Sequence, residues 1–314
     1  MERADGAAGP TPDLDLDQVF DRVDEHREEL IQRLVAYAGQ PSVSSTGEGI
    51  AEAAELACNV KVLLDGEEEL GSPNLPAFVE GHRDLLGADL AIWSDGPVHE
   101  SGRWCLVFGV RGIVTFELRA RGANRLDRGR VLASLGLERL DEPADRGFYE
   151  RLVAWPTFTV NGLRGGYGGP GTQTVLPNEA VAKCDVRLVP DQRTSDVLAK
   201  LEAHVARHAP GVELVRGGHM EPSRTPIDSR FTEPLRQAMV AALGEEPLLV
   251  PPLGGSLPAY VFTDILGLPT FGVPFANADQ TNHAPNENLE IERFIGGIKA
   301  AASMLAHLGA MRPL

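Results

Sequence analysis

The stretch NVKVLLDGEEELGSP, residues 59–73, decides the fold of this chain. Its first six residues, Asn59–Leu64, are β-branched or apolar in alternation and include no turn former, which predicts a buried strand. Asp65-Gly66 then predicts a turn. Ser72 and Pro73 suit the N-cap and the first position of a following helix. The stretch therefore predicts a strand, a turn and a helix in succession, as in an α/β protein.

Three consecutive glutamates, residues 67–69, occupy the turn between this strand and this helix. In an open α/β sheet, ligands bind in the crevice outside the carboxyl ends of the strands. A carboxylate cluster at that place predicts a metal site or a general base. The alternative for so short an acidic motif is a solvated turn without function, and the rest of the chain has to decide between the two.

The composition is that of an acidic globular protein. The chain has 314 residues, of which 43% are hydrophobic and 24% charged, enough for about two domains. A net charge of −16 argues against nucleic acid and anionic membrane surfaces as partners. We find no apolar run of about 18 residues and no signal-peptide pattern. Cys58, Cys105 and Cys184 are too few and too scattered for a disulfide framework or a thiolate metal site, so we expect a cytoplasmic protein.

Periodicity along the chain predicts an α/β fold with an inserted domain. Helical spacing of apolar residues predicts helices over residues 16–38, 50–57, 75–86, 194–208, 231–243, 257–266 and 291–308. Apolar runs predict strands over residues 88–93, 104–110, 113–120, 157–160, 180–188, 212–215, 248–250 and 270–273. We therefore predict one domain built from residues 1–108 and 224–314, interrupted by a smaller α+β domain at residues 109–223. The helix at 50–57 runs into the Asn59 strand almost without a connection, although such loops usually take about 2–6 residues.

Four candidate site residues come from three separate strand-to-loop transitions: Glu68 and Glu69, Asp95, and His283. Carboxylate and imidazole groups suit zinc, and an adjacent spare carboxylate suits deprotonation of a metal-bound water. Taken singly, each residue also has a structural interpretation. Asp95 precedes Gly-Pro and fits a turn, and His283 fits a surface loop. Together they predict a hydrolytic metal site.

Six segments resemble, in order and over nearly the whole chain, the motifs of a family of di-zinc metallopeptidases. The family includes carnosinase-type dipeptidases, glutamate carboxypeptidases, aminoacylases and succinyl-diaminopimelate desuccinylases. The segments are LDGEEELGSP (64–73), DLAIWSDGP (89–97), VFGVRGIVTFELRARGANR (107–125), GGYGGPGTQTVLPNEAVAKCDVRLVPDQ (165–192), PPLGGSLP (251–258) and NHAPNENL (282–289). The resemblance implies a catalytic α/β domain with a mainly parallel sheet between helices, interrupted by a lid domain that usually makes a homodimer.

The resemblance also implies a role for each candidate residue. Glu68 resembles the general base, Glu69 a ligand of one zinc and Asp95 a ligand of the other, while His283 resembles a second ligand of the zinc that Glu69 holds. The loop Gly254, Gly255 and Ser256 resembles the one that receives the substrate's carboxylate, which fits an anion site of backbone N–H groups at the start of the predicted helix 257–266. A serine N-cap is the alternative for that loop.

The chain departs from the family in two places. A strand ending in Gly-His-x-Asp and an aspartate that bridges both metals are missing at the Cys58/Asn59 junction. A His-Ser-Gly segment is missing after Arg125. Gly81-His82-Arg83-Asp84 spells the lost motif, but it falls on a predicted helix, so we interpret it as a solvated helix face.

The missing ligands lead to a specific hypothesis. Two zinc ions need a bridging carboxylate to offset their repulsion, so we expect one loosely held zinc, cobalt or manganese ion, or none. The missing strands predict a marginally stable protein. We predict a hydrolase for dipeptides or N-acyl amino acids, impaired in this form. Two alternatives are a non-catalytic remnant that dimerises or binds a carboxylate ligand, and a metal-free hydrolase that uses Glu68 and Asp95.

Overall fold

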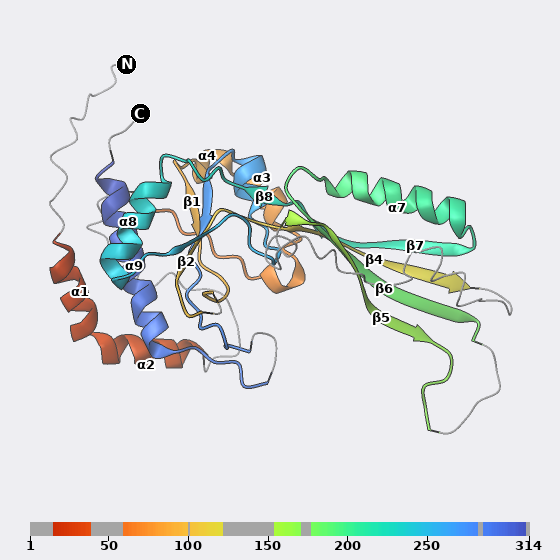
Figure 1. The fold of residues 1–314 in the computed structure, drawn as a ribbon, viewed down its shortest axis with the longest axis horizontal. Coiled ribbons are helices and arrows are strands. Elements are labelled where there is room, and N and C mark those ends of the chain that lie inside the picture. The colour runs from red at the N-terminus through yellow and green to blue at the C-terminus, as the bar shows by residue number, and fades with distance from the viewer. Residues whose placement is uncertain are drawn as a thin grey trace, which may run out of the picture.

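The computed structural model describes residues 15–38, 59–99, 101–121, 154–170, 177–281 and 285–311 of the chain (Figure 1). Its first sheet has the strand order β1 (Ala91–Trp93), β10 (Thr270–Gly272), β2 (Cys105–Val107) and β9 (Leu248–Val250). The pairs β1–β10 and β2–β9 are parallel, whereas β10 and β2 are antiparallel. The predicted mainly parallel sheet is therefore confirmed.

Helices α8 (Thr232–Leu243) and α9 (Ile291–Gly309) pack on one side of this sheet (Figure 1). Apolar side chains of both helices meet those of β2 and β10 in the main core, where Phe108 and Phe271 lie edge to face with ring centroids 5.6 Å apart. Other fully buried members of this core are Leu106, Leu235, Ala238, Met239 and Val273. Each helix presents one apolar stripe to the sheet, as its sequence periodicity predicts.

A smaller core lies around helix α3 (Leu75–Gly81) and the short π-helical segment η2 (Val261–Ile265). Leu75, Val79 and Val261 are its buried members. Helix α4 (Arg83–Leu86) follows α3, so helices flank the first sheet on more than one side (Figure 1).

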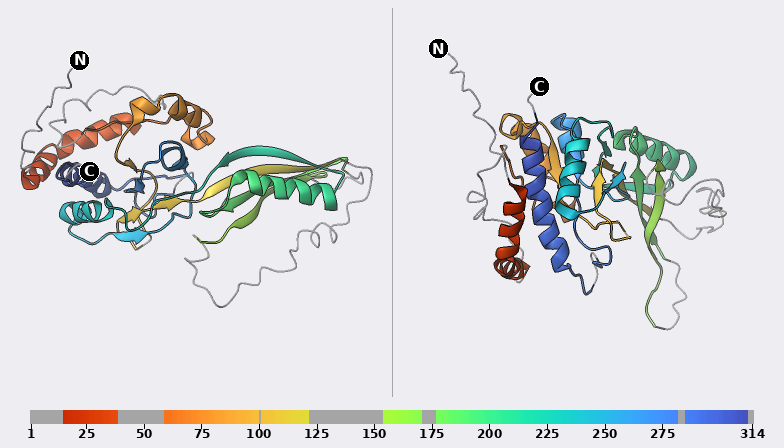
Figure 2. Two further views of the ribbon diagram at one scale, coloured as in Figure 1. Left: turned by 90° about the horizontal axis from the view of Figure 1, so that it is seen from above. Right: turned by 60° about the vertical axis from the view of Figure 1, so that its left-hand side comes forward.

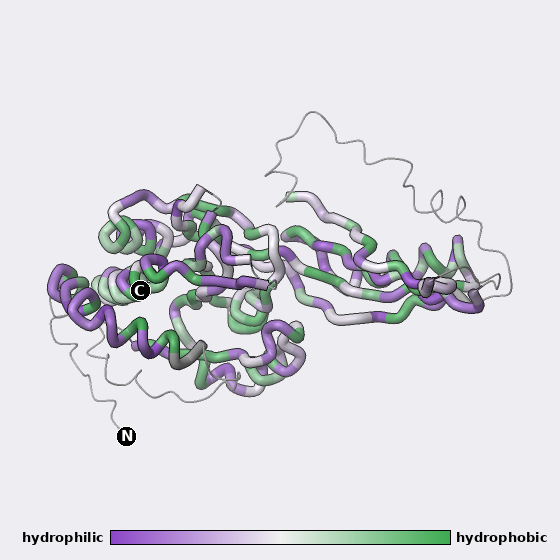
Figure 3. Tube along the Cα trace, turned by 90° about the horizontal axis from the view of Figure 1, so that it is seen from below, coloured by the Kyte–Doolittle hydropathy of each residue, from purple (hydrophilic) through white to green (hydrophobic). Residues whose placement is uncertain are grey.

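A second, four-stranded sheet extends away from this body and is called the distal sheet below (Figures 1 and 2). Its order is β5 (Thr157–Gly165), β6 (Glu179–Leu188), β4 (Gly112–Arg121) and β7 (Val212–Met220), with every neighbouring pair antiparallel. Hydrophobic and hydrophilic residues alternate along these strands (Figure 3). The apolar side chains meet α7 (Thr194–His208) on one face, so the distal part is α+β, as predicted.

Two short strands, β3 (Gly109–Val110) and β8 (Ser223–Arg224), pair where the chain enters and leaves the distal sheet. A side chain on Gly109 would place its Cβ 2.2 Å from the carbonyl oxygen of Ser223, so only glycine permits this close approach. The pair lies at the predicted domain boundaries, after residues 108 and 223. The division of the chain into domains stays a prediction.

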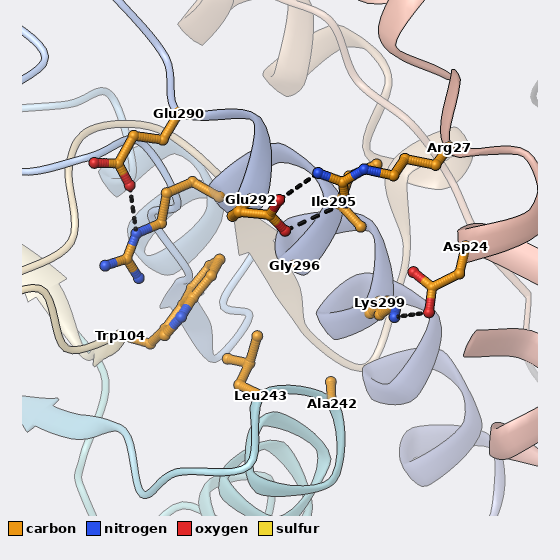
Figure 4. Close-up of a pocket in the computed structure, with 11 residues that line it drawn as sticks. Asp24, Arg27, Trp104, Ala242, Leu243, Glu290, Glu292, Ile295, Gly296 and Lys299 are labelled. Atoms are coloured by element: carbon orange, nitrogen blue, oxygen red, sulfur yellow. Dashed lines mark hydrogen bonds and ion pairs between the residues drawn. The ribbon is translucent and has the colours of Figure 1, made fainter. Parts of the chain in front are cut away.

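Two N-terminal helices, α1 (Leu16–Glu25) and α2 (Arg27–Ala38), replace the single helix predicted over residues 16–38. No residue of α1 is buried. Its contacts with α9 include an ion pair of Asp24 with Lys299 at 2.6 Å, and Lys299 also lies over the ring of Phe20. Arg27 at the start of α2 pairs with Glu292 of α9. Figure 4 shows both ion pairs beside a cavity of about 360 Å³ next to Trp104.

The predicted strand Asn59–Leu64 is wrong. The segment pairs with no strand among the described residues, and Val60, Val62 and Leu64 are 42%, 53% and 69% exposed. A strand is stabilised by backbone pairing with neighbouring strands, and none of the described strands pairs with this segment. The predicted helix at residues 50–57 lies outside the described residues.

Two other predicted helices differ in extent. The helix predicted over residues 75–86 breaks at His82 into α3 and α4. The helix predicted over residues 257–266 is reduced to η2, which begins only at Val261. Within the part of the chain that the structure describes, no helix has both the length and the apolar character needed to cross a membrane.

Candidate active site

The acidic turn after Leu64 is held by its own side chains. Asp65 accepts hydrogen bonds from the backbone N–H of Glu67 at 2.9 Å and from the hydroxyl of Ser72, which is only 1% exposed. Glu67 accepts bonds from the backbone N–H of Asn74 at 3.3 Å and from its side-chain amide at 2.9 Å. Asp65 and Glu67 therefore have structural roles in the turn and the start of α3.

Glu68 and Glu69 lie in the single 3₁₀ turn η1 (Glu68–Leu70), which Gly71 closes with a left-handed φ of 84°. Glu68 is half-buried, and Glu69 is exposed. The roles of Glu68 as general base and of Glu69 as metal ligand stay predictions.

Asp95 follows β1 in an exposed loop that runs beside the segment after β10. Val98 donates its backbone N–H to the carbonyl of Ala276 at 2.8 Å, and Ala276 donates to the carbonyl of Gly96 at 3.3 Å. Because β1 and β10 are parallel, their carboxyl ends meet at one edge of the sheet. The loop of Asp95 thus lies next to the segment that leads, seven residues after Ala276, to position 283.

His283 itself lies outside the described residues. The chain on both sides of it is fixed by Asn277, which is only 2% exposed. The Asn277 side chain donates to Asn288 at 2.8 Å and accepts the backbone N–H of Glu290 at 2.9 Å. Asn277 therefore joins the two ends of this loop. Sequence reasoning missed this anchor, because an asparagine ahead of a polar loop carries no distinctive pattern.

The candidate ligands are of the right kind for zinc, which binds carboxylate oxygens and imidazole nitrogens. Among the residues that the structure describes, however, no three His, Cys, Asp or Glu side chains are grouped closely enough to hold a metal ion. Glu69 and Asp95 therefore do not form a complete site with other described residues, and the predicted third ligand is His283.

The loop Gly254–Ser256 does not start a helix, which corrects the predicted anion site at a helix N-terminus. The loop is instead bound to the entry of the distal sheet. Gly255 accepts the backbone N–H of Arg111 at 3.0 Å, and Ser256 donates its hydroxyl to the carbonyl of Gly112 at 3.3 Å. The Ser256 hydroxyl in turn accepts a hydrogen bond from Arg187 at 2.8 Å.

Arg187 is a candidate site residue that sequence reasoning missed. It lies on β6 of the distal sheet, 69 positions before Ser256 in the chain. Its side chain is 34% exposed, so the guanidinium can reach solvent while it contacts the serine. A guanidinium beside a hydroxyl is suited to bind a carboxylate. The only sequence signal is the segment VRLVPDQ, in which an arginine interrupts a buried strand.

Two further charged groups surround Arg187. Asp185 lies two residues before it on β6, 7% exposed, with its carboxylate 3.5 Å from Nε of Arg187. Arg111 is 3% exposed and donates to the backbone carbonyl of Arg187 at 3.3 Å. Burial and the nearby charge of Arg187 lower the pKa of Arg111, and Asp185 partly offsets this effect.

Residues 46–307 match the Peptidase family M20/M25/M40, and the chain belongs to this family. The Cys-Gly metallodipeptidase DUG1 of Saccharomyces cerevisiae is 27% identical over 162 residues, which cover 49% of this chain and 33% of the yeast protein. The Beta-Ala-His dipeptidase of Homo sapiens is 22% identical over 326 residues, covering 82% of this chain and 63% of the human protein. The chain thus spans between one third and two thirds of these relatives.

Solved structures agree on the fold. The M20 family metallo-carboxypeptidase Sso-CP2 from Sulfolobus solfataricus superposes with a TM-score of 0.72 at 24% identity, covering 92% of this chain and 76% of that structure. Human carnosine dipeptidase 1 superposes with a TM-score of 0.65 at 20% identity, covering 83% of this chain and 69% of that structure. The predicted family and fold class are therefore confirmed.

Proposed function

We propose that this chain is a metal-dependent hydrolase that cleaves the amide bond of dipeptides or N-acyl amino acids. Glu68 accepts the proton of the attacking water and returns it to the leaving amine. Glu69, Asp95 and His283 would hold a zinc ion, which supplies Lewis-acid assistance to hydrolysis when bound. The loop Gly254–Ser256 and Arg187 bind the substrate's carboxylate.

The contact between Arg187 and Ser256 is the observation that carries this proposal. Dipeptides and N-acyl amino acids share one feature beyond the amide bond, a free carboxylate at the C-terminal end. The structure brings a guanidinium from the distal sheet and a hydroxyl from the main body together at 2.8 Å. The dipeptidase relatives and the match to the M20 family support the same class of substrate.

The test is a comparison of alanyl-alanine with alanyl-alaninamide as substrates, in the presence of added zinc, cobalt or manganese. The proposal expects hydrolysis of the dipeptide and a clear preference for it over the amide. The departures from the family at Cys58/Asn59 favour a second candidate, a non-catalytic protein that retains only carboxylate binding. A folded chain that binds the dipeptide but hydrolyses it with none of the three metals would support this second candidate.

We predict that purified protein binds at most one divalent ion per chain, with zinc, cobalt or manganese as candidates. Glu69, Asp95 and His283 offer three ligands, enough for one catalytic zinc, and the chain lacks the carboxylate that would bridge a second. Elemental analysis after dialysis measures the ratio of metal to protein. Two tightly bound zinc ions per chain would contradict the prediction.

We further propose a homodimer formed through the distal sheet. Its edge strand β5 exposes Phe158, Val160 and Leu163 by 41%, 44% and 80%. An edge strand with exposed apolar side chains is a template for pairing with another chain. Leu163→Lys is expected to shift the protein from dimer to monomer in sedimentation velocity at an unchanged thermal midpoint. A dimer that persists in this variant would refute this interface.

A cytoplasmic location, without nucleic acid or membrane partners, is part of the same proposal. Cys105 and Cys184 are buried free thiols, and burial raises the pKa of each. Thiols of this kind are weak nucleophiles, and their reduced state is expected in a reducing compartment. The net charge of −16 supports a small-molecule substrate over a polyanion.

A further inference from the structure

The group of charges around Arg187 has more cations than a structural ion pair requires. Arg111 lies between β3 and β4, Arg187 lies on β6, and Asp185 is an acidic neighbour of both. The formal charge of the three groups is one positive unit, in a chain whose net charge is −16. Arg111 is only 3% exposed, whereas the side chain of Arg187 is 34% exposed. Arg187 is therefore the cation of this group that a substrate carboxylate can approach from solvent.

Asp185 is held by Asn161 of the neighbouring strand β5. Residue 159 of β5 is its neighbour across the sheet, and the register of β5 then shifts between Val160 and Gly162. At this irregularity Asn161 donates its side-chain amide to one carboxylate oxygen of Asp185 at 2.7 Å. The other carboxylate oxygen faces Nε of Arg187. A β-bulge commonly redirects a side chain in this way.

Asp185 and the substrate's carboxylate thus share one guanidinium. Nε of Arg187 faces Asp185 at 3.5 Å, and Nη1 donates to Ser256 at 2.8 Å. An anion already close to the guanidinium lowers the attraction that remains for a second anion. The hydrolysis product, an amino acid, carries the same carboxylate as the substrate and has to leave this position after each reaction.

We propose that Asp185 is an internal counter-ion that weakens carboxylate binding at Arg187 and thereby speeds release of the amino acid product. This inference rests on the proposed function, because it assumes that the carboxylate binds at Arg187 and Ser256. Asp185 does not contact the reacting amide. Its role is to set the affinity of the site for the substrate's carboxylate, a group that the reaction does not change.

The test uses N-acetylalanine and N-acetylalaninamide as probes, titrated into the full chain by calorimetry. Asp185→Asn retains the size of the side chain and one acceptor oxygen, and it removes the negative charge. We expect the dissociation constant of N-acetylalanine to fall about tenfold, as a nearby charge at intermediate dielectric allows, and that of the amide to stay unchanged. Alanine should also inhibit the variant more strongly than it inhibits the wild type.

A matched control is Glu117→Gln on the neighbouring strand β4. Glu117 pairs with Arg119 and Lys183, so this variant removes one negative charge from the same sheet without touching Arg187. The dissociation constant of N-acetylalanine should change less than about twofold, because exposed charges beyond a Debye length are screened. An equal effect in both variants would show a general charge effect and overturn the proposal.

A second variant covers the case in which Asp185→Asn does not fold. Asn161 is exposed, and its side-chain amide donates a hydrogen bond to Asp185, which also faces Arg187. Asn161→Ala removes this donor. Asp185 then pairs more fully with Arg187, so N-acetylalanine should bind about two- to threefold more weakly. Unchanged or weaker binding of N-acetylalanine by Asp185→Asn, or tighter binding by Asn161→Ala, would refute the counter-ion role. A wild-type chain that does not distinguish the acid from the amide would instead refute the proposed function.

Discussion

Replacement of Glu68 by glutamine is expected to lower kcat for dipeptide hydrolysis by about 10²–10⁴-fold, the range typical of a lost general base. Glutamine keeps the length and shape of the side chain but cannot accept a proton from water at neutral pH. In the proposed site, the substrate's carboxylate binds at Arg187 and Ser256, which belong to other segments. The dissociation constant of N-acetylalanine should therefore stay at the wild-type value while the rate falls.

The adjacent Glu67→Gln variant is the matched control. Glu67 accepts hydrogen bonds from Asn74, and the amide oxygen of glutamine can still accept the backbone N–H. Its kcat should remain within about threefold of wild type, because Glu67 holds the turn and the start of α3 and has no assigned role in the reaction. Release of free alanine from alanyl-alanine, with the same metal added to all three proteins, measures the effect. Full activity of Glu68→Gln, or an equal loss in both variants, would remove Glu68 from the role of general base.

Local sequence patterns predict a helix or strand correctly where the residues of that element are enough to determine it. Helix α7 spans the predicted residues 194–208, and β9 spans the predicted residues 248–250. In α7 the apolar residues recur at helical spacing and end in the basic residues Arg207 and His208, which favour a helix C-terminus. Such elements need little information from the rest of the chain.

Helix breaks at single histidines were missed, although they share one physical cause. The ring of His26 hydrogen-bonds to the carbonyl of Arg22 at 3.0 Å, and the ring of His82 to the carbonyl of Phe78 at 2.8 Å. In both cases the histidine ring adds a hydrogen bond to a carbonyl in the last turn of the preceding helix, although the Arg22 carbonyl also accepts the backbone N–H of His26 at 3.2 Å. Apolar periodicity continues across the break, so the pattern alone indicates one helix where there are two.

Asn59–Leu64 shows the opposite limit, because its strand pattern is clear and no strand forms. The pattern reports which side chains suit burial in a sheet, whereas a strand also requires partners. The sequence already indicated where such partners are missing, at the Cys58/Asn59 junction. Arg187 was missed for a related reason. Its contact with Ser256 depends on how the distal sheet meets the loop Gly254–Ser256, which neither local segment encodes.

The core between the first sheet and its helices should tolerate little change, and Phe271→Ala tests this. Phe271 is fully buried in β10, the strand that joins β1 and β2, and packs against Phe108. Truncation of a buried phenylalanine costs about 3–5 kcal/mol of the free energy of unfolding. Because missing strands predict a wild-type melting midpoint no higher than about 65 °C, this loss should leave the variant largely unfolded at 37 °C.

Phe158→Ala on β5 is the matched control, because it makes the same substitution at an exposed position. The same residue type is removed, but Phe158 is 41% exposed, so the loss should stay near 1 kcal/mol, the typical value for a point substitution. Urea unfolding followed by tryptophan fluorescence measures both variants, because Trp104 belongs to the main core. If Phe271→Ala unfolds at the wild-type urea concentration, the main core does not limit stability. A wild-type midpoint well above 65 °C would contradict the predicted marginal stability.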